Sequence, residues 1–381
     1  MCGLDLTPYE KIPDSTLHRL SSNLPGGVLL PKLEWLRWDA EASPIALTSF
    51  RLFLSPHLKN IVFSCLDMYD VPRSQLAGLV QTIPVLPTSL EDLTIMCGFE
   101  EEELLKDAIS SFICRCGSSL RAFRSSVLLS EAAVHHLMQL PNLRSWDTAQ
   151  GPPRTLPLSI FPALEELHLE ELAALQWLHL LASDEKGTFQ NHSTPTTSHA
   201  NIRETLRSLS CPPNTTIDST ILSSILKFRN LVMLYVGTYC DEAERCTFHL
   251  TDGDVENLAI TLPRLKSLQL GIVCDFNYCR TTVASLMSIS VHCPDLTSLE
   301  THFNTLTIVD DMKHLHDGGS GRGNAKCKLR NLKVGYLPLE VRGEDIETLV
   351  VGFKVIFPCL TDFTQYNDHW YELRSKLRMY I

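Results

Sequence analysis

A glycine-rich stretch is the first group of residues whose types and spacing could do chemistry. Asp317-Gly-Gly-Ser-Gly-Arg-Gly323 contains Gly318 and Gly323 at the spacing of a phosphate-binding loop. Such a loop needs a lysine and then a serine or threonine directly after the second glycine. Here Asn324 stands in the place of the lysine, and no hydroxyl residue follows it. We therefore expect a plain loop without a phosphate site.

Cysteine and histidine pairs are the second such group, because closely spaced thiolates and imidazoles bind zinc. The best candidate pairs are Cys274 with Cys279, His292 with Cys293, and His314 with His316. None of them forms the double Cys-x-x-Cys arrangement of structural zinc sites. Cys293 also stands directly before Pro294, where a helix is expected to end and a small buried residue fits. The sequence thus predicts neither a metal nor a cofactor.

Serine, histidine and aspartate are plentiful, but no Gly-x-Ser-x-Gly or other nucleophile signature appears. His135 and His136 lie on a predicted helix whose buried side carries Val134, Leu137 and Met138, so at least one histidine should face solvent. We expect a protein that is not an enzyme. A catalytic triad assembled from distant parts of the chain is the least favoured alternative.

The secondary-structure elements that position these residues are predicted from a recurring sequence motif, which we call the phrase. Its clearest copy is Pro263-Arg-Leu-Lys-Ser-Leu-Gln-Leu270. Apolar residues at the first, fourth and sixth positions, counted from the leading leucine, are typical of a short strand buried on one face. The twelve copies have leading leucines at Leu33, Leu58, Leu90, Leu120, Leu143, Leu164, Leu206, Leu231, Leu265, Leu296, Leu329 and Leu360. Those at Leu120 and Leu206 are the weakest.

Amphipathic helices are predicted between the phrases by their apolar periodicity. They are expected at 72–83, 100–116, 130–140, 217–228, 251–262, 281–292 and 344–356. Alternation of strands and helices predicts an α/β leucine-rich-repeat solenoid, curved, with parallel strands on its concave face and helices on its convex face. The expected organisation is an N-terminal lead-in over 1–30, a solenoid over 31–366 with loop insertions near 183–201 and 316–325, and a C-terminal cap helix over 367–381.

Composition and charge indicate which partners and which cellular location to expect. The 381 residues are 44% hydrophobic, which allows a large core, and the net charge of −11 argues against binding to nucleic acid. The thirteen cysteines show no disulfide-framework spacing. No signal peptide is visible, and no apolar run approaches the ~18 to 20 residues that cross a bilayer. We expect an intracellular protein, cytoplasmic or nuclear, that does not contact a membrane.

The third and fifth positions of each phrase point away from the core and form the remaining candidate site. Tryptophan, tyrosine and arginine tend to dominate binding energies between proteins, so this face is a candidate protein-binding surface. Its candidate residues are Trp35, Arg37, Arg124, Asp147, His168, Tyr235, Gln269, Glu300 and Lys333. The alternative is an inner face that is merely solvated.

The repeats resemble a known family over most of residues 29–370. The segments that carry the resemblance are Leu29–Trp38, Leu52–Phe63, Leu128–Leu143 and Phe161–Leu169. They are similar to leucine-rich repeats with long, helix-bearing units, and more narrowly to the repeat region of F-box proteins from mushroom-forming fungi. The resemblance implies the substrate-recognition part of a cullin-type ubiquitin ligase, with a protein target on the concave face.

The F-box that would grip the ligase adaptor is not recognisable in the residues before Leu33. The missing F-box therefore argues against the ligase adaptor as a partner. Adaptor binding through residues 1–30 is one alternative. A stand-alone leucine-rich-repeat interaction protein without a ligase link is the other.

Overall fold

The computed structural model describes most of the chain. The described residues are 3–6, 13–23, 28–39, 50–65, 89–97, 103–153, 160–170, 173–182, 200–211, 218–237, 249–271, 279–304, 307–317, 326–334, 343–365 and 371–379. The predicted helix at 72–83, the glycine-rich stretch from Gly318 onward and Cys274 lie outside them.

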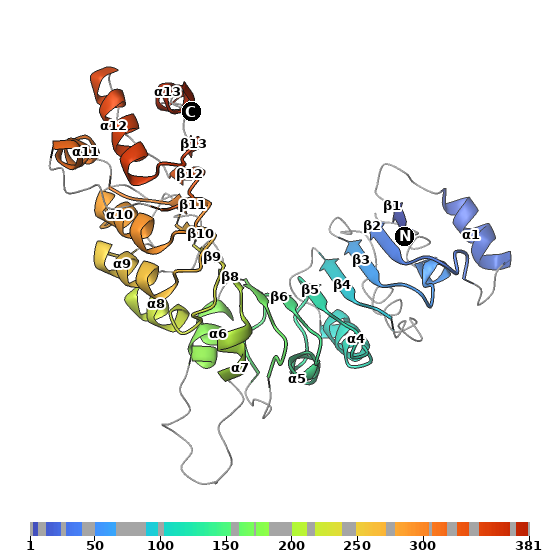
Figure 1. The fold of residues 1–381 in the computed structure, drawn as a ribbon. Coiled ribbons are helices and arrows are strands. Elements are labelled where there is room, and N and C mark those ends of the chain that lie inside the picture. The colour runs from blue at the N-terminus through green and yellow to red at the C-terminus, as the bar shows by residue number, and fades with distance from the viewer. Residues whose placement is uncertain are drawn as a thin grey trace, which may run out of the picture. The chain divides into compact units, whose positions relative to one another are not determined.

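The chain divides into two compact units, each built on a parallel sheet (Figure 1). Unit 1 comprises residues 1–173 and 193–205, and unit 2 comprises residues 174–192 and 206–381. In unit 1 the strands are β1 (Gly3–Leu6), β2 (Trp35–Asp39), β3 (Asn60–Cys65), β4 (Asp92–Cys97), β5 (Ala122–Ser125), β6 (Ser145–Thr148) and β7 (Glu166–Leu169). Its helices are α1 (Asp14–Asn23), the 3₁₀ turn η1 (Phe50–Phe53), α4 (Glu103–Ile113), α5 (Glu131–Gln139) and α7 (Ala200–Thr205).

Unit 2 repeats the same design. Its strands are β8 (Ser208–Cys211), β9 (Met233–Val236), β10 (Ser267–Leu270), β11 (Ser298–Thr301), β12 (Asn331–Val334) and β13 (Asp362–Gln365). Its helices are α6 (Ala173–Ala182), α8 (Ser219–Ile225), α9 (Asp252–Thr261), α10 (Val283–His292), α11 (Ile308–Asp317), α12 (Gly343–Ile356) and α13 (Tyr371–Met379).

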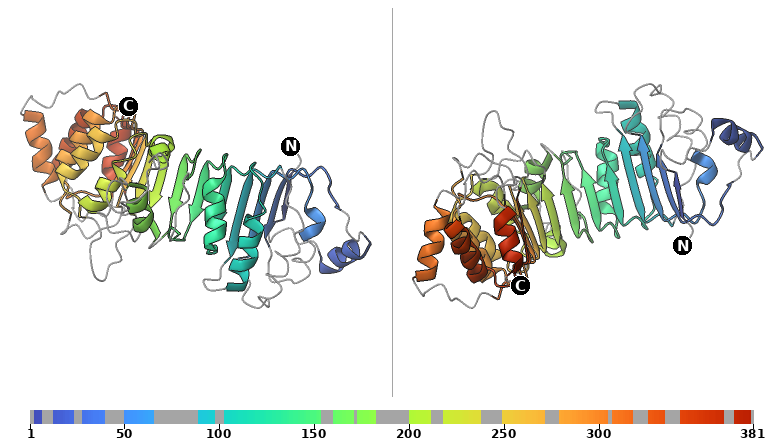
Figure 2. Two further views of the ribbon diagram at one scale, coloured as in Figure 1. Left: turned by 90° about the horizontal axis from the view of Figure 1, so that it is seen from below. Right: turned by 90° about the horizontal axis from the view of Figure 1, so that it is seen from above.

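Within each unit every strand pairs in parallel with the next one along the chain. The helices α4, α5 and α8 to α12 lie on one side of the strands of their own unit (Figure 2), whereas α13 lies next to the last strand, β13 (Figure 1). Every phrase becomes a strand that starts at its third position, including the weak copies at Leu120 and Leu206. The predicted α/β repeat fold of solenoid type is therefore confirmed. The strand β1 and the helix α1 lie in the lead-in, where no phrase occurs, and β1 pairs with β2.

The core consists of the apolar positions of the phrases and the inner faces of the helices. In the copy from Leu265, the first, fourth and sixth positions (Leu265, Leu268 and Leu270) are at most 1% exposed. Val255 and Leu258 of α9 are 2% and 0% exposed. Burying a leucine of this kind contributes about 1.5–3 kcal/mol relative to leaving it in water. Because each strand covers only one face, it becomes stable when neighbouring repeats and helices close over it.

The backbone at the start of each strand is fixed by a repeated pair of hydrogen bonds. The carbonyl oxygen of the second-position residue accepts two N–H groups from the next repeat. Lys266 and Ser267, for example, donate to Val232 at 2.8 and 3.2 Å, and Thr297 and Ser298 donate to Lys266 at 2.8 and 3.1 Å. The same geometry holds in unit 1. Side chains at the second position are consequently held in a regular row along each sheet.

The helices α11 and α12 approach closely at Gly352, and this contact gives a testable prediction. A Cβ atom added there would lie 2.9 Å from Cγ and 3.0 Å from Cβ of Met312, and closer still to its Sδ. Since Met312 is fully buried, Gly352→Ala should destabilise the protein by about 1 kcal/mol, overpacking outweighing the helix propensity of alanine. Urea unfolding followed by circular dichroism measures the change.

The matched control is Gly253→Ala in the first turn of α9. A Cβ there meets only Thr251 Oγ1, at 3.8 Å, so alanine should raise the free energy of unfolding by about 0.5–1 kcal/mol. Equal effects of the two substitutions would contradict the close approach of α11 and α12.

Candidate protein-binding surface

The third and fifth positions of the phrases lie on the face of each sheet that is opposite the helices. The strands show this by alternation: in β5, Phe123 and Ser125 are buried, Ala122 is half-buried and Arg124 is exposed. None of the fifth-position residues is buried in either unit. We name these two sets of side chains the strand-face rows. Apart from Ser208, which is 1% exposed, these side chains are accessible, and this is the geometry that a binding surface requires.

In unit 1 the register brings several candidates together. Arg124, Asp147 and His168 lie side by side on β5, β6 and β7. Arg124 Nε is 2.6 Å from Asp147 Oδ2, and the arginine side chain is 53% exposed. At the other end of the row, Arg37 Nε is 3.5 Å from Asp39 Oδ2. The half-buried Trp35 lies beside Asn60 of β3.

In unit 2 four candidates form one continuous run. Tyr235, Gln269, Glu300 and Lys333 occupy matching register positions on β9, β10, β11 and β12. Lys333 and Glu300 form an ion pair, and the Tyr235 hydroxyl donates to Ser267 Oγ at 3.2 Å. Parallel strands lie about 4.8 Å apart, so these side chains form a band about 15 Å long.

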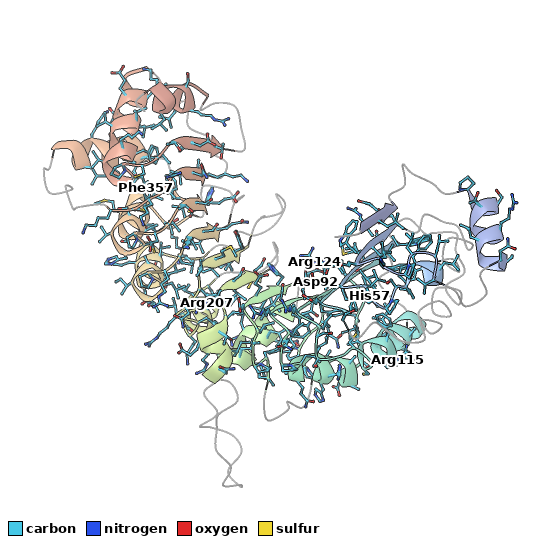
Figure 3. All side chains as sticks on the ribbon, turned by 45° about the vertical axis from the view of Figure 1, so that its right-hand side comes forward. His57, Asp92, Arg115, Arg124, Arg207 and Phe357 are labelled. Atoms are coloured by element: carbon cyan, nitrogen blue, oxygen red, sulfur yellow. The ribbon has the colours of Figure 1, made fainter. Side chains whose placement is uncertain are left out.

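Asp92, the first residue of β4, is an acidic member of the strand-face rows in unit 1. Partial burial, together with the nearby carboxylate of Glu91, raises the pKa of the Asp92 carboxyl, and Arg121 opposes the shift. Figure 3 labels Asp92 and Arg124, whose strands are neighbours in the sheet. The surface thus combines ion pairs, hydroxyls and a few aromatic rings, which suits hydrogen bonding with a partner.

The cysteine and histidine side chains described below pack in the core or contact the backbone. Burial raises the pKa of the Cys211 and Cys293 thiols to about 12, so both remain protonated at neutral pH. Cys293 Sγ donates to the carbonyl oxygens of Ala259 and Leu262, which matches the small buried residue expected at the end of α10. His136 Nε2 lies 3.1 Å from the Cys116 carbonyl oxygen. Among the described residues no three cysteine, histidine, aspartate or glutamate side chains form a metal-binding group.

Two groups of charged residues beside the strand-face rows were not predicted. Arg374 of α13 bonds the third-position Asp362 at 3.2 Å, so the last helix adds a cation next to the strand-face row of unit 2. Charged second-position residues form a further row at the start of the strands, such as Lys59 and Glu34 in unit 1. The sequence signal for this second-position row is the frequent charge at the second position of the phrases, which the pattern of apolar positions does not include.

Within the described ranges, no helix is both long and apolar enough to cross a membrane. No family model matches the sequence, and no curated protein matches it. Among solved structures the chain is similar to one from yeast titled "Crystal structure of Rad7 and Elc1 complex in yeast". The TM-score is 0.44 and the identity 16%, over 93% of this chain and 83% of that chain. The function must therefore be argued from this chain's own residues.

Proposed function

We propose that the protein is a non-catalytic recognition scaffold that binds another protein through its strand-face rows. The observation that carries this proposal is the continuous run of accessible polar side chains at the fifth positions, from Tyr235 to Lys333 in unit 2 and from Arg124 to His168 in unit 1. Such a run offers a partner many contacts on a backbone that is fixed by the sheet.

Arginine and tyrosine are the side chains most often found at binding hot spots, so Arg124 and Tyr235 are the candidates with the largest expected contribution. Both are held in place: Arg124 by Asp147, and Tyr235 by its hydrogen bond to Ser267. A side chain that is already oriented loses less conformational entropy when the partner binds.

Capture of partners from a lysate of the source cells, compared between the wild-type chain and variants, tests the proposal. Arg124→Ala and Tyr235→Ala should each weaken binding of a captured partner by about thirtyfold, the loss typical of a hot-spot side chain. Glu256→Ala, on the exposed side of α9, is the control and should leave binding unchanged. A partner that binds all three variants equally would contradict the proposal.

A charge swap separates recognition from stability in the same assay. Arg124→Asp combined with Asp147→Arg keeps an ion pair between β5 and β6 but inverts the charges shown to the partner. The Arg124 side chain is 53% exposed and that of Asp147 is 15% exposed. Because the swapped protein keeps an ion pair that is partly screened by solvent, it should fold normally. It should nevertheless lose the partner, which a purely structural role of Arg124 would not produce.

The finer proposal is a role like that of the repeat region of F-box subunits, in which the bound protein is a ubiquitin ligase substrate. The support is the resemblance of the repeats together with the accessible strand-face rows. Mixing the purified chain with a purified ligase adaptor tests the ligase link by size-exclusion chromatography. The absence of a complex would leave the stand-alone scaffold as the function.

A further inference from the structure

The second-position row carries different charges in the two units. In unit 1 bases and acids compensate each other through ion pairs: Lys59 with Glu34 at 3.7 Å, Arg121 with Glu91 at 3.4 Å, and Arg144 with Glu165 at 3.3 Å. In unit 2 the row contains no acid. Its members there are Arg207, Val232, Lys266, Thr297, Arg330 and Thr361.

The residues directly before the leading leucines extend this basic character. In unit 2, Arg264, Asp295 and Lys328 stand at these positions. The Asp295 carboxylate forms an ion pair with Lys328 Nζ at 2.7 Å. We name Arg207, Arg264, Lys266, Lys328 and Arg330 the basic rim. All five side chains are exposed at the start of the strands, although the whole protein has a net charge of −11.

Two guanidinium groups of the rim are held close together by a neutral residue. Arg207 Nη1 donates to the Asn230 carbonyl oxygen at 3.3 Å, and Arg264 Nη1 donates to Asn230 Oδ1 at 2.8 Å. Neither arginine forms an ion pair with a described residue, and most N–H donors of both guanidinium groups remain available. Like charges brought together in this way repel each other, and a bound anion would remove that cost.

We propose that the basic rim of unit 2 is a second binding surface, which takes an extended acidic polypeptide segment rich in aspartate and glutamate. The basic second-position residues Arg207, Lys266 and Arg330 recur on every second strand, about 10 Å apart. An extended chain in the polyproline II conformation advances about 3.1 Å per residue with three residues per turn, so acidic side chains at every third position lie on one face and meet each of them. The surface is separate from the strand-face rows, and this inference does not depend on the proposed function.

The chemistry of the rim favours a polypeptide over single-stranded nucleic acid. Proteins that bind single strands combine basic side chains with aromatic rings on which the bases stack. The described rim positions and the residues between them contain no aromatic side chain, and Val232, Thr297 and Thr361 fill the gaps. Arginine also binds carboxylates through two parallel hydrogen bonds, which suits aspartate and glutamate.

Fluorescence anisotropy with the full chain and a labelled twelve-residue peptide, with aspartate at every third position, tests the proposal. Saturable binding that weakens with salt is expected. Arg207→Gln with Arg264→Gln, and separately Lys266→Gln with Arg330→Gln, should each weaken it about fivefold, as expected for the loss of two exposed ion pairs. The matched control is Lys59→Gln with Arg121→Gln, which removes the same number of positive charges from second positions in unit 1.

Three results would overturn the proposal. An equal loss in the control variant would show that net charge alone governs binding. A single-stranded oligonucleotide with the same number of charges that binds as tightly, and with the same sensitivity to the rim variants, would assign the rim to nucleic acid instead. Absence of saturable peptide binding at low salt, with circular dichroism showing a folded chain, would remove the rim as a site.

Discussion

Replacement of Trp146 by alanine is expected to lower the free energy of unfolding by about 3–5 kcal/mol, the largest effect of a single core substitution in unit 1. Trp146 is 0% exposed and occupies the fourth position of its phrase on β6. Its ring packs against Phe161, with centroids 5.1 Å apart. Phe161 has a φ of 49°, and its N–H donates to the Met138 carbonyl oxygen at 2.7 Å. Removing the indole leaves a cavity against a backbone that cannot easily move to fill it.

Urea unfolding followed by far-ultraviolet circular dichroism measures this loss. Trp146→Leu is the matched variant, because leucine stands at the same position in the next strand, as Leu167. It should cost clearly less than alanine, since it retains part of the buried volume. If the two substitutions cost the same, the cavity explanation would be wrong.

Asp252→Ala should destabilise unit 2 by about 3 kcal/mol, because its carboxylate joins two consecutive helices. Asp252 lies in the first turn of α9 and accepts three hydrogen bonds from α10. The donors are Thr282 N at 2.7 Å, Thr282 Oγ1 at 2.8 Å and Ser285 Oγ. Thr282 is the N-cap of α10, so the substitution disturbs the start of both helices.

A graded series in α9 makes this prediction sharp. Asp254→Ala removes only the capping box with Thr251 and should cost about 1 kcal/mol. Glu256→Ala, which is exposed, should change stability by less than about 0.5 kcal/mol. Equal costs for Asp252→Ala and Asp254→Ala would refute the bridging role. Urea midpoints of the four proteins provide the comparison.

The sequence was sufficient to predict the twelve strands of the recurring phrases, because their period of two is a local property. Leu265, Leu268 and Leu270 identify a buried face without reference to any other repeat, and the fifth-position row follows from the same alternation. Helices with strong caps were predictable for the same reason: Ser130 and Thr251 each accept a backbone N–H of the helix that they begin. Short elements were missed, such as β1 with four residues and α7 with six, whose stability depends on neighbouring repeats rather than on local pattern.

The tertiary structure alone decided which side chains meet across repeats. The spacing between phrases varies, so sequence separation does not reveal that Asp252 reaches Ser285, or that Arg207 and Arg264 share Asn230. Those contacts exist only after the strands have paired and fixed their register. The sequence therefore determined which face of each strand is accessible. Strand pairing determined which charges on that face and along its rim are compensated, because an ion pair forms only between residues that the register brings within a few ångströms of each other.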